Sequence, residues 1–248
     1  MKKKYKIIAI IQTRMGSSRL PNKALLDLGG KPSILRMIER VKLSKLISKI
    51  YIATSLSRED DSLASLVNKE KKICLYRGDE RNVLSRFYEI SKKEKAEIII
   101  RLTGDCPLID PFIIDQTIEL LILKKADYAS NTLKRTYPDG LDVEVFTASS
   151  LYSTYKNVRD SYSKEHVTPY IHGKSKKLFK TGTFKKASLE YVADFSYLRW
   201  TLDEQKDLDF LNIVFKGISA QAKWLEVVSF LMNLLFFEKV LSCDQNHI

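Results

Sequence analysis

The chain has 248 residues, of which 44% are hydrophobic and 29% charged, and its formal net charge at pH 7 is +12. These proportions are normal for a soluble globular protein, and a chain of this length buries a sizeable core without covalent cross-links. The three cysteines, Cys74, Cys106 and Cys243, show no close pairing. This argues against a disulfide framework and a cysteine-based zinc site, and it favours a reducing, cytoplasmic location.

The positive charge does not by itself indicate a nucleic-acid partner. Much of the excess is lysine in scattered groups, at Lys2, Lys69 and Lys92, and not in one basic stripe with interleaved aromatic residues. We therefore expect a lysine-rich surface and no nucleic-acid partner.

Neither end of the chain predicts membrane insertion. The basic start leads into a short apolar run that Gln12 and Arg14 interrupt. Without a small-residue cleavage site, this start predicts a first strand and not a signal peptide. The apolar run 227–237 is too short to span a bilayer. It predicts a buried terminal helix. The alternative is that this helix forms a subunit interface, and hence a homodimer.

Along the first half of the chain, apolar runs alternate with segments of helical periodicity. The run 6–11 is continuously apolar after Lys6, as expected for a strand covered on both faces, and Ile34, Ile38 and Val41 then share one helical face. The further expected strands are 49–55, 73–77, 97–103 and 126–130, and the further expected helices are 58–70, 82–90 and 111–123. Such alternation predicts a parallel sheet with helices on both faces.

The second half is expected to be a mixed extension of the same domain. The segment 140–147 alternates strictly, which predicts a strand with one polar face. The segments 179–184 and 189–195 are also strand-like, and 199–215 is typical of a strand end that leads into a helix. We therefore expect one domain over 1–248.

Ligands of open parallel sheets bind outside the carboxyl ends of the strands. That rule selects the loops 12–23, 76–82 and 103–110. The first loop carries Arg14, Arg19 and Lys23, and the glycine and serines between them allow a tight path with exposed N–H groups, which suits an anion. The loop has neither a Walker A nor a G-x-G-x-x-G pattern, and a basic surface loop is the alternative.

Two aspartates are candidate metal ligands. Asp105 follows a Thr-Gly turn at the end of an expected strand, and Asp203 stands at the start of an expected helix. Mg²⁺ is commonly bound by one or two carboxylates together with substrate phosphates. The alternatives are that Asp105 forms a turn and that Asp203 caps its helix, the role that we expect for Asp110.

Polar residues of the second half point to a second ligand. Asp142 and Glu144 would be costly to bury unpaired, so their strand face is either exposed or lines a pocket for a hydroxylated molecule. Glu165 and His166 are candidates for contact with a polar substrate, although histidines at the spacing of His166 and His172 more often pack or donate hydrogen bonds.

Five motifs in chain order resemble those of a known family: IIQTRMGSSRLPNKALLDLGGKP, RLTGDCPLIDP, YPDGLDVEVF, EHVTPYIH and RWTLDEQKDLDF. They resemble the cytidylyltransferases of the spore-coat polysaccharide type, relatives of the CMP-ketodeoxyoctulosonate and CMP-acylneuraminate synthetases. The resemblance implies an α/β nucleotide-diphospho-sugar transferase fold, a Rossmannoid three-layer sandwich with a mostly parallel sheet and a mixed C-terminal extension. It also implies a nucleotide-binding half, 1–135, and a sugar-binding half with the C-terminal helices, 136–248.

The same resemblance implies that CTP and a sugar, commonly a sugar acid, give a CMP-sugar and pyrophosphate for surface polysaccharide biosynthesis. The implied catalytic residues are Arg14, Lys23, Asp105 and Asp203, with Mg²⁺ on the two aspartates. The implied nucleotide contacts are Gln12, Arg14, Gly16, Ser17, Ser18, Arg19, Lys23, Arg77 and Asn82. From the polar residues themselves, we expect Asp142, Glu144, Glu165 and His166 to contact the sugar, with Asp142 or Glu144 as the base if a protein base is needed.

Two other functions stay open. A glycosyltransferase of the same general fold would use a preformed nucleotide sugar, but it usually carries a D-x-D motif at a strand end, for which DLDF and LDVEVF are poorly placed. A non-catalytic nucleotide-binding protein should have lost a loop cation or Asp105, and none is missing. The first loop also departs from the ARxGSKRIPxKN pattern of acylneuraminate enzymes, which disfavours an acylneuraminate substrate.

Overall fold

The computed structural model describes residues 5–173 and 184–244, with side chains as far as 234. Its centre is a seven-stranded sheet in the order β3-β2-β1-β4-β6-β5-β7. The strands are β1 (Ile7–Gln12), β2 (Lys49–Ser55), β3 (Ile73–Gly78), β4 (Ile98–Thr103), β5 (Tyr128–Ser130), β6 (Glu144–Thr147) and β7 (Lys186–Ser188). In the described part of the chain, β6 runs antiparallel to both of its neighbours and the other strand pairs are parallel.

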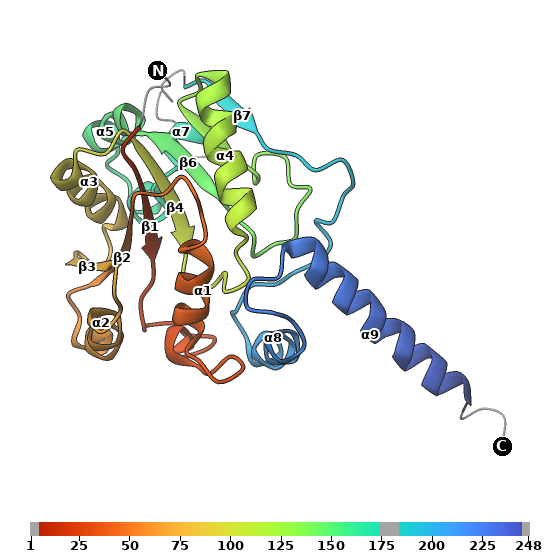
Figure 1. The fold of residues 1–248 in the computed structure, drawn as a ribbon. Helices are drawn as coiled ribbons and strands as arrows, with labels where there is room; N and C mark the ends of the chain where they lie inside the picture. Colours follow the sequence, from red (N-terminus) through yellow and green to blue (C-terminus); the bar gives the residue numbers. More distant parts are fainter. Residues whose placement is uncertain (1–4, 174–183, 245–248) are drawn as a thin grey trace.

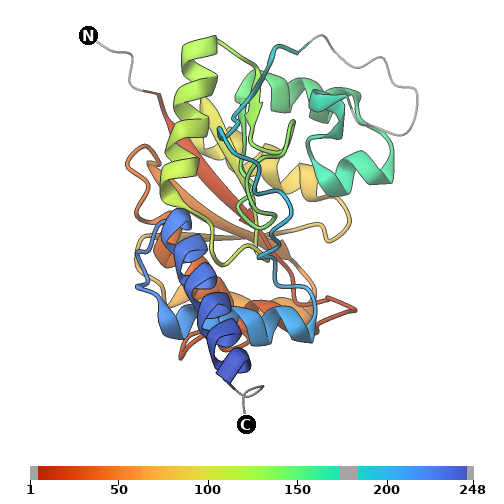
Figure 2. The same ribbon diagram turned by 90° about the vertical axis from the view of Figure 1, so that its right-hand side faces the viewer.

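Helices cover both faces of this sheet, because alternate residues of each buried strand point to opposite sides. Ile7, Ala9 and Ile11 of β1 pack on one side, whereas Ile8 and Ile10 pack on the other. The first side is covered by α1 (Ser33–Val41), α2 (Asp61–Asn68), α4 (Pro111–Lys124) and α8 (Gln205–Gly217), and the second by α3 (Val83–Glu94), α5 (Ala148–Asn157) and α7 (Pro169–His172). Figures 1 and 2 show the resulting three layers.

The strands and helices expected in the first half are confirmed to within a few residues. The parallel strands β1, β2 and β4 are almost wholly buried, which explains why their sequences are nearly continuous apolar runs. Asp110 caps α4 as expected, since its carboxylate accepts hydrogen bonds from the backbone N–H groups of Phe112 (2.7 Å) and Ile113 (3.4 Å).

The strand expected over 140–147 is shorter in the structure, where β6 begins only at Glu144. The side chain of Asn131 bonds the carbonyl of Leu141 (2.7 Å) and the N–H of Val143 (2.9 Å), and it thereby replaces strand-to-strand pairing over this stretch. Gly140 has a φ of 105°, and an added Cβ would lie 2.7 Å from the Trp200 backbone, so the chain turns tightly there.

The strand expected over 189–195 is wrong, because the structure places the short strand β7 just before it. The N–H groups of Tyr191 and Phe195 donate to the side chain and carbonyl of Thr136. Those donors are therefore not available for a β ladder. Of the strand expected over 179–184, residues 179–183 lie outside the described residues.

Among its described side chains, 224–234, the C-terminal helix α9 (Trp224–Asp244) is buried mainly where it begins, so the expectation of a buried terminal helix holds for its first turns, and the side chains of 235–237 lie outside the described residues. Trp224 and Val227 are buried, whereas Met232 is 66% exposed. Figure 1 shows the helix leading away from the body of the molecule. Over the described residues, no helix combines the length and the apolar character needed to cross a bilayer.

Candidate functional site

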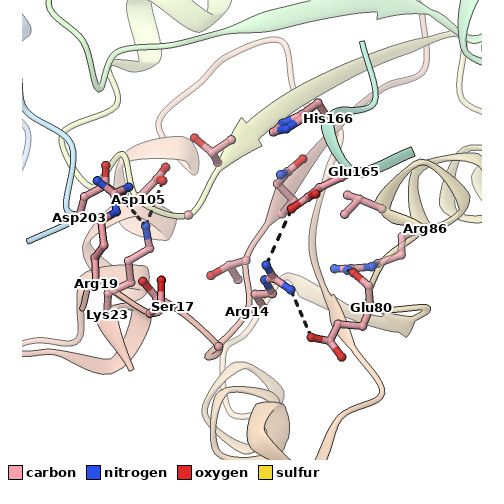
Figure 3. A pocket seen from close by; sticks show the side chains of 17 residues that line it. Arg14, Ser17, Arg19, Lys23, Glu80, Arg86, Asp105, Glu165, His166 and Asp203 are labelled. Atoms are coloured by element: carbon pink, nitrogen blue, oxygen red, sulfur yellow. Dashed lines mark hydrogen bonds and ion pairs between the residues drawn. The ribbon is translucent and has the colours of Figure 1, made fainter. Parts of the chain in front are cut away.

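A cavity of about 410 Å³ opens at the carboxyl ends of β1 and β4, where the first and third loops meet. It brings together many of the residues that the sequence predicts for the site. Those in its lining are Gln12, Arg14, Gly16, Ser17, Ser18, Arg19, Lys23, Asp105, Glu165, His166 and Asp203. The site residues therefore come from both halves of the chain (Figure 3).

Asp60 holds the basic loop in place from beneath. This aspartate belongs to the 3₁₀ turn η2 (Arg58–Asp60) and is 1% exposed. Its carboxylate accepts from the N–H of Met15 at 2.7 Å, and from Thr54 and Ser55 at the end of β2. Burial alone would raise the pKa of Asp60, but the hydrogen bonds from Ser55, Met15 and Thr54 outweigh it and lower the pKa.

Lys23 joins the two predicted metal ligands. It begins the 3₁₀ turn η1 (Lys23–Leu25), and its Nζ lies 3.1 Å from Asp105 Oδ2 and 2.9 Å from Asp203 Oδ1. Burial would lower the pKa of Lys23, but the two carboxylates outweigh it and raise the pKa. Figure 3 shows this ammonium group between the two acids.

A long-range backbone contact brings Asp203 to Asp105. The N–H of Leu202 donates to the carbonyl of Asp105 at 2.8 Å, which fixes the segment before α8 against the loop after β4. Glu204 and not Asp203 is the N-cap of α8, and Asp207 completes a capping box with it. The helix-cap alternative for Asp203 therefore does not hold, and its carboxylate is turned to cations instead.

Three cations surround Asp203. Besides Lys23, the guanidinium groups of Arg19 and Arg199 lie 3.2 and 3.1 Å from its oxygens. Burial would raise the pKa of Asp203, but these cations, Lys23 foremost, lower it. The carboxylate is thus held ionised, as a metal ligand must be.

The two carboxylates fit a hard divalent cation whose remaining ligands are phosphate oxygens of a substrate. Among residues 5–173 and 184–234, no group of three or more histidines, cysteines or acids is placed to form a complete protein cage for a metal. Asp105 and Asp203 offer two carboxylates on one common point, the position of the Lys23 ammonium. One or two carboxylates are the usual protein contribution to a Mg²⁺ site, and substrate phosphates supply further ligands.

The opposite wall of the cavity contains Arg14, which the sequence predicts, and also Glu80 and Arg86, which the sequence analysis missed. Arg14 lies 3.2 Å from Glu80 and 3.8 Å from Glu165, so it spans the cavity between the loop after β3 and the helix α6 (Ser161–His166). Arg86 is 2% exposed and donates to the carbonyls of Asp79 and Glu80. A charged residue on the apolar face of α3, three residues after Val83, is the sequence feature that could have identified Arg86 as a buried, functional side chain.

Two predicted nucleotide contacts lie elsewhere. The guanidinium of Arg77 donates to the carbonyls of Ser55 and Ser57 and pairs with Asp61 at 2.7 Å. Asn82 caps α3 through the N–H of Ser85. Neither lines the cavity, and we do not carry them into the proposed site.

A second cavity, of about 300 Å³, adjoins the first and shares Thr103 and His166 with it. Because β6 is antiparallel to β4, its first residue, Glu144, lies at the edge where the parallel strands end. This pairing explains how a residue of the second half reaches the site. Asp142, which precedes β6, lines the same cavity.

Both acids of this second cavity are held by arginines. Glu144 pairs with Arg101 and accepts from Tyr128 and Thr168, each at 2.6 Å. Burial would raise its pKa, but Arg101 and these hydrogen bonds lower it. Asp142 is bound by both terminal nitrogens of Arg135, at 2.6 and 2.7 Å. Burial nevertheless raises the pKa of Asp142 against the effect of Arg135.

His166 stands where the two cavities join. Its ring lies 4.4 Å from that of Tyr162, measured between centroids. Burial lowers the pKa of His166 although Glu165 opposes the shift. The imidazole is therefore neutral at pH 7 and able to accept a proton.

These features place the molecule among the nucleotidyltransferases, in which fixed cations and a carboxylate-bound metal neutralise a nucleoside triphosphate. The sequence narrows the class further. The profile of the Cytidylyltransferase family matches residues 8–223, and the chain belongs to this family. The fold and enzyme class implied by the motif resemblance are thereby confirmed.

Individual relatives agree with this assignment. The spore coat polysaccharide biosynthesis protein SpsF of Bacillus subtilis is 34% identical over 216 residues, which cover 85% of this chain and 86% of SpsF. The 3-deoxy-manno-octulosonate cytidylyltransferase of Geobacter sulfurreducens is 35% identical over 60% of each chain. The solved structure of a cytidylyltransferase from Leptospira borgpetersenii matches with a TM-score of 0.85 and 30% identity, over 92% of this chain and 94% of that one.

Proposed function

We propose that this cytidylyltransferase transfers CMP from CTP to a hydroxyl group of a sugar acid, with release of pyrophosphate. The observation that carries the proposal is the pair of polar cavities joined at Thr103 and His166. One cavity has the cations and carboxylates that a nucleoside triphosphate and its metal require, and the other is lined mainly by polar and charged groups around a sugar-sized space. A hydroxyl in the second cavity can thus approach an α-phosphate in the first.

The basic loop is assigned to the triphosphate. Arg14, Arg19 and Lys23 supply fixed positive charge, and Ser17 and Ser18 line the same wall. Preorganised cations stabilise the charge that grows on a leaving pyrophosphate, because they need no rearrangement during the reaction. Positioning of the two substrates supplies much of the remaining rate enhancement.

Asp105 and Asp203 are assigned to Mg²⁺. When bound, the metal would neutralise phosphate oxygens of the nucleotide. The chain itself holds both carboxylates at the cavity wall, one through the loop after β4 and the other through the backbone bond between Leu202 and Asp105.

The second cavity is assigned to the acceptor. Asp142, Glu144, Thr132 and Thr168 line it, and their hydrogen-bonding groups suit a hydroxylated molecule. Since both acids are engaged by arginines, we assign the acceptor proton to His166 and not to Asp142 or Glu144. A sugar acid is proposed because a relative carries the name 3-deoxy-manno-octulosonate cytidylyltransferase, and a role in surface polysaccharide synthesis because another is named for spore coat polysaccharide.

On this proposal, residues 1–135 form mainly the nucleotide side of the site and residues 136–248 mainly the acceptor side. Asp203, Glu165 and His166 of the second half also reach the nucleotide cavity, so the two sides share one site. We also propose a homodimer, because α9 leaves the body of the molecule with Leu225 and Met232 exposed.

The test is pyrophosphate release, measured with each of the four nucleoside triphosphates against a panel of sugar acids, amino sugars and neutral sugars. We expect release with CTP and a sugar acid only. A product that forms from a preformed nucleotide sugar would favour a glycosyltransferase. CTP binding without turnover on any acceptor would favour a non-catalytic nucleotide-binding protein.

A further inference from the structure

Lys23 occupies the point at which the two proposed metal ligands converge. Its Nζ is within hydrogen-bond distance of Asp105 and Asp203, which follow it in the chain by 82 and 180 residues. Its side chain is only 16% exposed, although lysine normally extends into solvent. In the described residues, this ammonium group is the only cation that touches both acids.

The contact of Lys23 with both aspartates offsets the repulsion between their carboxylates in the nucleotide-free protein. Two carboxylates that face one point repel each other unless a cation lies between them. Asp203 has Arg19 and Arg199 as further partners. Asp105, in contrast, has no other cation among its described ion pairs, so Lys23 supplies its positive counter-charge.

An ammonium group and a divalent cation cannot share this point. A metal bound by both acids would have to lie about 2 Å from an oxygen of each, which is within the space that the Lys23 ammonium fills. Binding of the metal therefore requires that Lys23 leave. The same cavity that holds Lys23 also holds Arg14 and Arg19, so a triphosphate bound there offers the displaced ammonium a new anionic partner.

We propose that Lys23 is a built-in substitute for the divalent metal, which holds Asp105 and Asp203 together until CTP draws it away. This inference rests on the proposed metal role of the two aspartates and adds an order of events. Metal and nucleotide each bind weakly alone and strengthen each other, because each favours the arrangement in which Lys23 has left the two aspartates. Such coupling is reciprocal by thermodynamic necessity.

The experiment measures Mn²⁺ binding to nucleotide-free protein by the EPR signal of free Mn²⁺. We compare the wild type with Lys23→Met, which keeps most of the length of the side chain and removes its charge, and with Lys23→Arg, which keeps the charge. We expect Lys23→Met to bind Mn²⁺ about tenfold or more tightly than the wild type, and Lys23→Arg to remain weak. Adding CTP should tighten Mn²⁺ binding by about tenfold or more in the wild type and much less in Lys23→Met.

Controls separate the possible failures. Lys31→Met, at an exposed lysine that pairs with Glu39, should behave as the wild type. The double variant Lys23→Met with Asp105→Asn should lose the gained Mn²⁺ site. If wild type and Lys23→Met bind Mn²⁺ equally well without nucleotide, the proposed role of Lys23 is wrong, while the metal assignment of the two aspartates stands. Absence of Mn²⁺ binding in every variant, even with CTP, would overturn the metal assignment and this inference with it.

Discussion

At the scale of single residues, His166 is the titratable group that touches both cavities. Its pKa lies below the ordinary 6.5 because of burial, so the neutral form predominates at neutral pH. A base of this kind loses its function as the pH falls through its pKa, since protonation removes the accepting lone pair. The acidic limb of the pH–rate profile should therefore lie below pH 6.5 and belong to this histidine.

This assignment predicts the behaviour of His166→Gln. We expect the variant to lower kcat by about 10²-fold or more and to abolish the acidic limb, measured as kcat between pH 5 and pH 8. The control is His172→Gln, because His172 lines only the second cavity. A variant His166→Gln that keeps the limb of the wild type would show that another group accepts the proton.

At the scale of elements, the basic loop depends on a buried carboxylate beneath it. Asp60 links the loop after β1 to the end of β2 through Met15, Thr54 and Ser55. In Asp60→Asn, an amide N–H₂ group would face some of these donors. We expect the free energy of unfolding to fall by about 1–3 kcal/mol and the KM for CTP to rise, because the loop loses its fixed path.

Glu94→Gln is the matched control for this prediction. Glu94 pairs with Lys49 and Tyr51 at the amino ends of the strands, away from the site, and Lys49 foremost lowers the pKa of Glu94 to about 2. Both variants should lose stability, but only Asp60→Asn should change the KM for CTP. An unchanged KM in Asp60→Asn would mean that the loop is positioned without Asp60.

The pH dependence has a definite sign for both carboxylates. Each has a folded-state pKa below its ordinary value, so each stabilises the fold above that ordinary value and loses this contribution as the pH falls. The difference in free energy of unfolding between wild type and either variant should thus be constant above about pH 5 and shrink below it. Urea denaturation at a series of pH values measures it.

The elements also show what could be predicted from the sequence. Strands β1, β2 and β4 are buried on both faces, and their apolar runs identify them directly. Strands β5 and β7 have three residues each, and the side chain of Asn131 replaces the ladder before β6. The strand expected over 126–130 contains β5, but the short β7 and the side-chain substitute before β6 leave little periodicity in the sequence, and these two were not predicted.

Part of the candidate site could also be predicted from the sequence, and part could not. The loop cations and Asp105 follow buried strands, so the rule for parallel sheets predicts where they gather. The meeting of Asp203 with Asp105 depends on a backbone bond between distant segments, which no local pattern contains. The ion pairs of Asp142 and Glu144 with arginines likewise depend on tertiary contacts.

At the scale of the whole molecule, α9 leads away from the body and exposes apolar side chains within its described part. Met232 is 66% exposed and Leu225 is 43% exposed. We expect the chain to be a dimer by size-exclusion chromatography with light scattering, and Met232→Glu to shift it toward monomer. Asn233→Glu, at an exposed polar position of the same helix, is the control. A wild type that is monomeric at micromolar concentration would contradict the proposed homodimer.

On the proposed mechanism, the basic loop binds a triphosphate whose metal is held by Asp105 and Asp203. The most direct measurement is the rate of pyrophosphate release from CTP with a sugar-acid acceptor in the wild type, Asp105→Asn and Asp203→Asn. We predict that each substitution lowers kcat/KM by about 10²–10³-fold while the protein remains folded by circular dichroism. Turnover within a few-fold of the wild type in both folded variants would contradict the account.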